Sequence, residues 1–403
     1  MFRQKGFLKP NRWWFLLGLA GLTGACNNGN QTTSSLAAAC STADLTAQYL
    51  VTESGQTLCF DANGLNITCP SSTGNYYGQD GNYTGRANHF GLCSNNQVTL
   101  DYNTGLMWEK AYHGQANYST ASAYCDGLDL GGYADWRLPG IKELVTLADF
   151  SGSVDDTSST SPSNPYLDTQ YFDIAYDTAL SSLTGTHVVQ MMGQTWSATV
   201  RPDLSTSNYF YNFLDGHLKS NLNSVTTATA MYRCVRGDSA GVTNSLTDNG
   251  DQTVSDSKTG LVWQKANATE STGDYQFTWT AAMNYCESLT LASHTDWRLP
   301  NVKELASILD YTNQSYSIDT TVFTSTYTTN TGPFFWTGTT DEEAPKYAYY
   351  VCFGHCWDYL LTSDVHGPGA IRSDPKYDNG NLPTSLGDQK DLVQANNYVR
   401  CVR

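Results

Sequence analysis

Basic residues are scarce in this sequence. Its 403 residues include 22 lysines and arginines against 38 aspartates and glutamates, which gives a formal net charge of −16. A protein that binds nucleic acid needs a basic surface, so this balance excludes nucleic acid as the expected partner. The same balance disfavours attraction of the whole surface to anionic membranes or to sulfated glycans.

Motifs of catalysis and of metal binding are also missing. No stretch has the paired carboxylate spacing of a hydrolase or the ligand spacing of a structural zinc site. The acidic stretch TDNGDQTVSD at 247–256 lacks the ordered oxygen ligands of an EF-hand, so we expect a polar hairpin there. We therefore expect no catalytic residue, no bound metal and no cofactor.

One short apolar run lies near the start of the chain. It extends from Trp13 to Ala25 and follows four basic residues (Arg3, Lys5, Lys9 and Arg12). The run is too short for a comfortable transmembrane helix and is typical of a signal peptide. It ends in LTGAC, which resembles a bacterial lipobox with Cys26 as the acylated residue. We expect a signal peptide at 1–26, a flexible tether at 27–54 and a lipid anchor in the membrane, at the outer membrane or cell surface; the alternative is secretion.

Ten cysteines remain once Cys26 is set aside, and an even number in an exported protein indicates disulfides. Cys352 and Cys356 lie close together in CFGHC, where a local disulfide is favoured because zinc commonly needs four ligands. The sequence alone does not fix the pairing of the first four cysteines. Our working choice pairs them as Cys59–Cys69 and Cys40–Cys93.

A long internal repeat dominates the rest of the chain. ADWRLPGIKEL at 134–144 and TDWRLPNVKEL at 295–305 share eight of eleven residues. TGLMW or TGLVW precedes each stretch, a tryptophan-led strand (W-S or W-T) and RCVR follow it, and a cysteine lies eleven positions before each motif tryptophan. The repeat predicts two copies of one module: a cysteine-containing lead-in at 55–98, a first domain at 99–237, a linker at 238–252 and a second domain at 253–403.

The order of local patterns within each copy predicts an α+β fold. Strand patterns flank the TGLMW and TGLVW turns, and Thr120 and Thr280 are the expected N-caps of the cysteine-bearing helices. Pro139 and Pro300 suit the first turn of a second helix in each copy. Short strands follow, so we expect two helices packed on mainly antiparallel strands in each domain.

The repeated DWRLP motif is interpreted as scaffold. Its tryptophans, Trp136 and Trp297, are expected to fill the core. The neighbouring arginines are expected to be half-buried, and a guanidinium there needs a carboxylate partner. The candidate partners are Asp135 or Glu143 for Arg137, and Asp296 or Glu304 for Arg298.

The segment 361–391 is the longest insertion unique to one copy, and it is rich in glycine, proline and charge. Loops of this length are usually functional or disordered. The candidate ligand-binding residues in it are His366, Arg372, Asp374 and Lys376. The alternative is an ordinary surface excursion.

These motifs together resemble the Lcl C-terminal domain family over nearly all of 99–236 and 253–403. That family is a domain of unknown function common in exported bacterial proteins and found at the tip of a collagen-like adhesin that binds sulfated glycans. The resemblance implies two tandem C-type-lectin-like domains, in which Cys125–Cys234 and Cys286–Cys401 tie the first helix to the closing strand. The WRLP…KEL stretch is also similar to a helix start in formylglycine-generating enzymes, which share that fold class.

The resemblance and the acidic composition lead to one expected function. We expect an exported, non-catalytic binding or adhesion module whose partner is an extracellular glycan or a surface or matrix protein. One alternative is a structural component of the envelope or matrix that has no small ligand. The other alternative is an oxidoreductase of the formylglycine-generating type.

Overall fold

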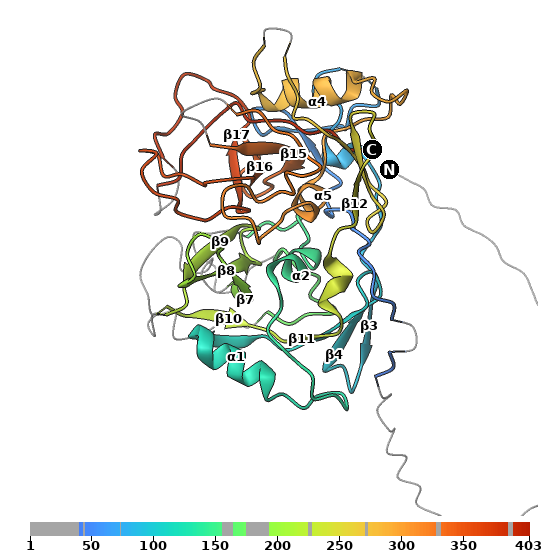
Figure 1. The fold of residues 1–403 in the computed structure, drawn as a ribbon, viewed down its shortest axis with the longest axis vertical. Coiled ribbons are helices and arrows are strands. Elements are labelled where there is room, and N and C mark those ends of the chain that lie inside the picture. The colour runs from blue at the N-terminus through green and yellow to red at the C-terminus, as the bar shows by residue number, and fades with distance from the viewer. Residues whose placement is uncertain are drawn as a thin grey trace, which may run out of the picture. The chain divides into compact units, whose positions relative to one another are not determined.

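The computed structural model describes residues 40–42, 45–72, 74–154, 164–174, 193–224, 228–270, 273–327, 332–385 and 390–403 (Figure 1). The expected signal peptide, Cys26 and the first part of the expected tether lie outside the described residues. Residues 37–403 form one compact unit. Among the described residues, no helix has the length and apolar character needed to cross a membrane.

The fold is α+β, with strands in the majority and four α-helices in the described part of the chain. The lead-in contributes β1 (Cys59–Phe60), β2 (Asn66–Ile67), the 3-10 helix η1 (Asp80–Asn82) and β3 (Phe90–Cys93). The first copy contributes β4 (Val98–Asp101), β5 (Leu106–Glu109), β6 (His113–Ala116), α1 (Tyr118–Asp126), α2 (Ile141–Thr146), β7 (Gln194–Val200), β8 (Ser207–Asn212), β9 (Leu218–Leu222), β10 (Ala230–Tyr232) and β11 (Val235–Arg236).

The linker and the second copy repeat much of this order. The linker holds the 3-10 helix η3 (Ser239–Val242) and β12 (Leu246–Asp248). The second copy has β13 (Thr253–Asp256), β14 (Val262–Gln264), α4 (Trp279–Ser288), α5 (Val302–Ser307), β15 (Phe334–Thr340), β16 (Tyr347–Cys352) and β17 (Ile371–Pro375). Almost all strand pairs are antiparallel; β10 and β7 pair in parallel.

The helices begin at residues other than the ones expected. Asn117 caps α1 and Thr278 caps α4, each accepting a backbone N–H with its side-chain oxygen. The predicted caps Thr120 and Thr280 therefore lie inside the helices. Asparagine is as good a cap as threonine, so local pattern alone could not choose between them. The motif prolines also lie one residue before the caps of α2 and α5, not in the first turn.

The two copies share one eight-stranded sheet in the order β15-β16-β17-β9-β8-β7-β10-β6 (Figure 1). The copies join at the antiparallel pairing of β9 with β17, where Leu218 lies opposite Ile371. These are the third strands of equivalent hairpin runs, which begin at β7 and at β15. Two equivalent edges that pair in antiparallel fashion are the arrangement of a two-fold symmetric dimer, here built within one chain.

The hydrophobic core is also shared between the copies. Helices α2 and α5 contact each other. Ile141 and Leu144 of α2 belong to the same buried cluster as Val302 and Leu305 of α5. Because this cluster is continuous across the repeat, each copy buries part of its apolar surface against the other, and each also has a smaller cluster of its own. The domain boundaries predicted within 99–403 stay predictions.

The lysine of each KEL motif donates hydrogen bonds to the other copy. Lys142 Nζ donates to Leu309 O at 3.1 Å, and Lys303 Nζ donates to Ala148 O and Thr146 O, each at 3.0 Å. Leu309 and Ala148 are equivalent positions, so the exchange is reciprocal. Each lysine thus satisfies carbonyls at the end of the other copy's motif helix.

Five disulfides form among the described residues, and they are the five expected pairs. They are Cys125–Cys234, Cys286–Cys401, Cys352–Cys356, Cys59–Cys69 and Cys40–Cys93. Cys125 and Cys286 lie on α1 and α4, and their partners belong to the RCVR segments. The first helix of each copy is therefore tied to the end of that copy.

Part of the expected tether is packed. Tyr49 is buried, and the backbone N–H groups of Gln48 and Leu50 donate to Thr104 O and Asn103 O, each at 3.3 Å. Residues 45–54 therefore lie along the first copy, and the predicted flexible tether does not extend to residue 54. Burial of Tyr49 holds this part of the chain in place. The polar composition of 27–35, on which the tether was predicted, gave no indication of this.

Candidate functional site

The arginine of each DWRLP motif pairs with the glutamate of KEL. Arg137 Nη1 and Nη2 donate to Glu143 at 2.8 and 2.6 Å, and both contacts between Arg298 and Glu304 are 2.6 Å long. The same glutamates accept the backbone N–H of the residue that caps each motif helix, Gly140 or Asn301. Two parallel charge-assisted hydrogen bonds are the strongest form of this ion pair, so each pair fixes the turn against its helix.

The motif aspartates have a different partner. Asp135 accepts from Arg236 at 2.7 and 3.0 Å, and Asp296 accepts from Arg403 at 2.9 and 3.2 Å. Of the two candidate partners for each motif arginine, the glutamate is therefore correct and the aspartate is wrong. The repeated last arginine of RCVR was the signal that could have indicated this second pair.

The motif tryptophans are buried as expected. Trp136 is 3% exposed and Trp297 is 1% exposed. Each indole N–H donates to a backbone carbonyl, Leu130 O or Leu291 O. These contacts confirm that the tryptophans fill the core.

The first arginine of each RCVR segment was missed as a structural residue. Arg233 and Arg400 are almost fully buried and donate to backbone carbonyls, among them Lys110 O and Gln264 O, each at 2.8 Å. Burial lowers the pKa of each guanidinium to about 10. An arginine that binds backbone carbonyls has no acidic partner that could be recognised in the sequence. The repetition of the RCVR segment was therefore the only signal for Arg233 and Arg400.

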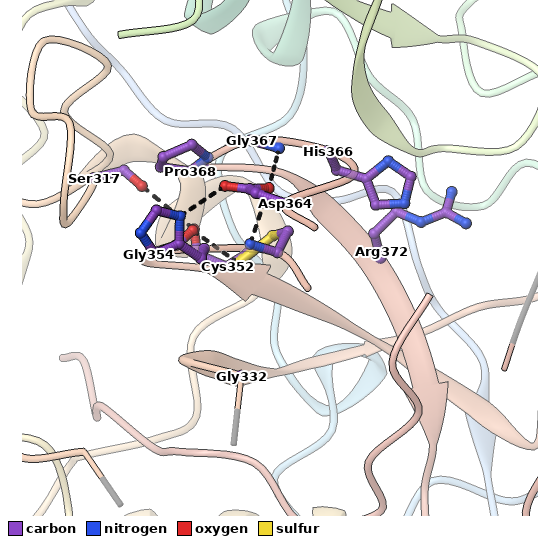
Figure 2. The surroundings of a disulfide bond; sticks show 12 residues. Ser317, Gly332, Cys352, Gly354, Asp364, His366, Gly367, Pro368 and Arg372 are labelled. Atoms are coloured by element: carbon purple, nitrogen blue, oxygen red, sulfur yellow. Dashed lines mark hydrogen bonds and ion pairs between the residues drawn. A yellow bond between two sulfur atoms is a disulfide. The ribbon is translucent and has the colours of Figure 1, made fainter. Parts of the chain in front are cut away.

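Residues 366–376 of the expected ligand loop are largely buried and include β17. His366 and Arg372 lie side by side in Figure 2. Arg372 donates to the carboxylate of Asp391, and Nε2 of His366 contacts the same carboxylate. His366 is 1% exposed and Arg372 is 8% exposed. Burial acts to raise the pKa of the Asp391 carboxyl group, but the charge of Arg372 outweighs burial and holds this pKa well below its usual range.

The other two residues of that set are also enclosed. Asp374 accepts from Asn397 Nδ2 at 3.0 Å, and burial raises the pKa of its carboxyl group. Lys376 donates to Thr340 Oγ1 at 2.9 Å and lies 4.0 Å above the Trp279 ring. The alternative of an ordinary surface excursion is therefore wrong for 366–376, because the polar side chains are buried and satisfy one another around a sheet strand. Their role toward a ligand stays a prediction.

The nearby Cys352–Cys356 disulfide closes a small loop beside Asp364. This carboxylate accepts from the backbone N–H of Gly367 at 2.7 Å and of Cys356 at 3.2 Å, and contacts His355 (Figure 2). The two sulfurs are bonded to each other, so they do not act as metal ligands. In the described ranges, no group of three or more His, Cys, Asp or Glu residues could hold a metal ion.

A cavity of about 700 Å³ opens beside the start of α2 in the first copy. Arg137, Thr199 and Asp126 line it from that copy, and residues 308–312 of the second copy line another side. The lining is mixed: Leu138, Ile141, Leu309 and Tyr311 alternate with Lys142, Asn244, Asp310 and Asp319. Burial lowers the pKa of Lys142 to about 8. The sequence did not predict this cavity.

A model of the Lcl C-terminal domain family matches residues 97–236 and 252–373. The chain belongs to this family. The comparisons with curated proteins and with solved structures find no match.

In the second Lcl C-terminal domain, a segment of the lead-in occupies the equivalent place. Residues 78–83, which we call the plug, pack against β15 and the DWRLP motif of this domain. Asp80 accepts from Thr339 Oγ1 at 2.7 Å, and the Arg298 guanidinium lies 5.2 Å from the centre of the Tyr83 ring. Two equivalent sites thus differ: one holds a segment of the chain and one is hollow.

Proposed function

We propose that this protein is an exported, lipid-anchored surface protein that acts as a non-catalytic binding module. The binding site would be the cavity of the first Lcl C-terminal domain. Ligand sites are commonly concave, with an apolar lining and a few placed polar groups, and this cavity has that character. The observation that carries the proposal is that the second domain already holds a peptide segment at the equivalent place.

We also propose that each Lcl C-terminal domain has the C-type-lectin-like fold. The disulfide from the first helix to the end of each copy supports this, as do the two helices that precede the antiparallel run of three strands beginning at β7 or β15. A catalytic role of the formylglycine-generating type has less support. Such chemistry needs a reactive cysteine pair, and the residues that line the cavity include no cysteine.

The lipid anchor rests on the basic start of the chain, its short apolar run and LTGAC. The variant Cys26→Ala should leave the protein unprocessed or release it from the membrane fraction. Mass spectrometry of the mature protein and fractionation of the envelope measure both outcomes. An unchanged mature mass together with unchanged membrane retention contradicts the anchor.

Two matched tryptophan variants test the cavity. Ala198 lines it, whereas Val200 lies two residues further along β7, is 39% exposed and does not line it. A screen of glycans and matrix proteins against the purified protein identifies ligands. We expect Ala198→Trp to abolish binding and Val200→Trp to retain it. Binding that survives Ala198→Trp places the site elsewhere, and a screen without hits favours a structural component of the envelope.

A further inference from the structure

The plug shows what this kind of site recognises. Its carboxylate, Asp80, is buried and accepts from Thr339 on β15. Its phenol, Tyr83, donates to the Glu287 carboxylate on α4, and the Tyr83 ring lies near Arg298. The plug therefore presents a carboxylate and, three residues later, a tyrosine. The second domain receives them with the hydroxyl of Thr339, the carboxylate of Glu287 and the guanidinium of Arg298.

The first domain has the same three groups around its cavity. Thr199 follows Trp196 by three residues, as Thr339 follows Trp336. Asp126 directly follows Cys125, as Glu287 follows Cys286, and Arg137 is the motif arginine. Thr199, Asp126 and Arg137 all line the cavity.

The framework that presents these groups is also the same. Thr199 Oγ1 accepts the Ile141 N–H at 2.9 Å, and Thr339 Oγ1 accepts the Val302 N–H at 3.0 Å. The N–H of Ala198 donates to Pro139 O at 2.7 Å, and its counterpart donates to Pro300 O at 2.8 Å. The strand, the motif turn and the start of the helix thus keep one geometry in both domains.

Three substitutions set the size of the hollow site. Gly338 of the second domain is Ala198 in the first, and a Cβ at Gly338 would lie 3.3 Å from Asp80 N. A segment in the first domain must therefore lie a few tenths of an ångström further out. In the opposite direction, Asn301 is replaced by Gly140 and Met283 by Ser122. Smaller side chains there leave room for that shift.

We propose that the cavity of the first domain binds a peptide segment of another protein that carries an aspartate and, three residues later, a tyrosine. The aspartate would accept from Thr199, and the tyrosine would donate to Asp126 with its ring against Arg137. The plug itself is held in the second domain by its own contacts and by the Cys59–Cys69 loop before it. This inference rests on the proposed function and names the ligand class of the same site.

A labelled peptide that copies residues 74–85 (GNYYGQDGNYTG) is the probe. Fluorescence anisotropy with the whole protein should give saturable binding. Peptides in which Asp80 becomes Asn or Tyr83 becomes Phe should bind at least about tenfold more weakly, since each loses one charge-assisted hydrogen bond.

Protein variants place the peptide in the cavity. Asp126→Ala should weaken binding at least about tenfold, and Ala198→Trp should abolish it. Asp129→Ala is the matched control, because Asp129 is an exposed aspartate close to Asp126 that does not line the cavity. Its affinity should equal that of the unaltered protein.

The outcomes separate this inference from the proposed function. Absence of peptide binding, or binding unchanged by Asp126→Ala, overturns the inference. If a glycan or protein from the screen still binds in a manner that Ala198→Trp abolishes, the proposed function stands without it. If no ligand of any class depends on the cavity, both fail.

Discussion

At the scale of single residues, the motif Asp296-Trp297-Arg298 contains two ion pairs of unequal weight. The Arg298 side chain is 21% exposed and its partner Glu304 is 9% exposed, whereas Asp296 is 63% exposed. Removing one partner of a buried pair leaves an uncompensated charge, while exposed pairs contribute little. Arg298→Ala should lower the free energy of unfolding by about 3 kcal/mol, and Asp296→Ala by less than about 1 kcal/mol.

Chemical denaturation of the two variants beside the unaltered protein measures this difference. Equal losses in both variants contradict the assignment of Glu304 as the partner that matters. Sequence reasoning could reduce the choice to Asp296 or Glu304 but could not decide it. Both carboxylates lie within reach of the arginine along the chain, and only the fold brings Arg403 to Asp296.

Asp80 should make stability depend on pH. Burial raises the pKa of its carboxyl group from 3.8 to about 6, with Glu304 acting in the same direction and Thr339 and Arg298 against it. The folded state therefore binds this proton more tightly than the unfolded state. The corresponding stability is present below about pH 4 and is lost as the pH rises through 6, by roughly 3 kcal/mol.

Asp80→Asn removes that titration and keeps an oxygen that can accept from Thr339. The variant should gain stability relative to the unaltered protein as the pH is raised from 4 to 7. Urea denaturation of both proteins at several pH values measures the gain. A difference that does not change with pH means that Asp80 is not held in a buried site.

At the scale of elements, the disulfide from α1 to the RCVR segment should outweigh the local one. Cys125 and Cys234 are 109 residues apart, whereas Cys352 and Cys356 are 4 apart. In the chain-entropy account, a bridge that closes the longer loop contributes about 5 kcal/mol and the shorter one about 2 kcal/mol. The double variant Cys125→Ala/Cys234→Ala should therefore lose much more stability than Cys352→Ala/Cys356→Ala.

Thermal and chemical unfolding of the two double variants, each with the other four bridges intact, compares them. The idea fails if the local pair contributes as much as the long one.

Elements were predicted best where the signal was local. The cysteine-bearing helices, the motif helices and the tryptophan-led strands follow from period and turns, although the capping residues were misplaced by a few positions. The segment 361–391 was misjudged because its glycines and prolines are typical of a loop. It nevertheless contains β17, whose polar side chains Arg372 and Asp374 are buried with Asp391 and Asn397, 19 and 23 residues further along the chain. A strand whose polar residues are satisfied by distant groups has no local signature.

At the scale of the whole molecule, the two copies should unfold together. They share the eight-stranded sheet through β9 and β17, and one buried cluster runs across α2 and α5. Calorimetry should show one transition, and Arg137→Ala and Arg298→Ala should each shift that same transition. Two separated transitions, each moved by only one variant, contradict a shared core.

This joining of the copies could not be read from the sequence. The repeat indicates two modules, and identical motifs are equally compatible with separate domains. What couples them is the pairing of two strand edges and the reciprocal contacts of Lys142 and Lys303. Those contacts depend on the three-dimensional relation of the copies. The cavity of the first domain could not be predicted for the same reason. It is recognised as a hollow site only when it is compared with the equivalent place in the second domain, which the plug fills.

The central claim is that two equivalent sites differ in occupancy, one open and one filled by the plug. Thr199 and Thr339 are matched reporters, because each hydroxyl accepts the first N–H of its motif helix and the described part of the chain has its ten cysteines in disulfides. Thr199 lines the cavity and is partly exposed, whereas Thr339 is fully buried. The most direct measurement is the rate at which a maleimide modifies Thr199→Cys and Thr339→Cys in the native protein. The account predicts rapid modification at position 199 and modification at 339 only when the protein unfolds; equal rates at the two positions would contradict it.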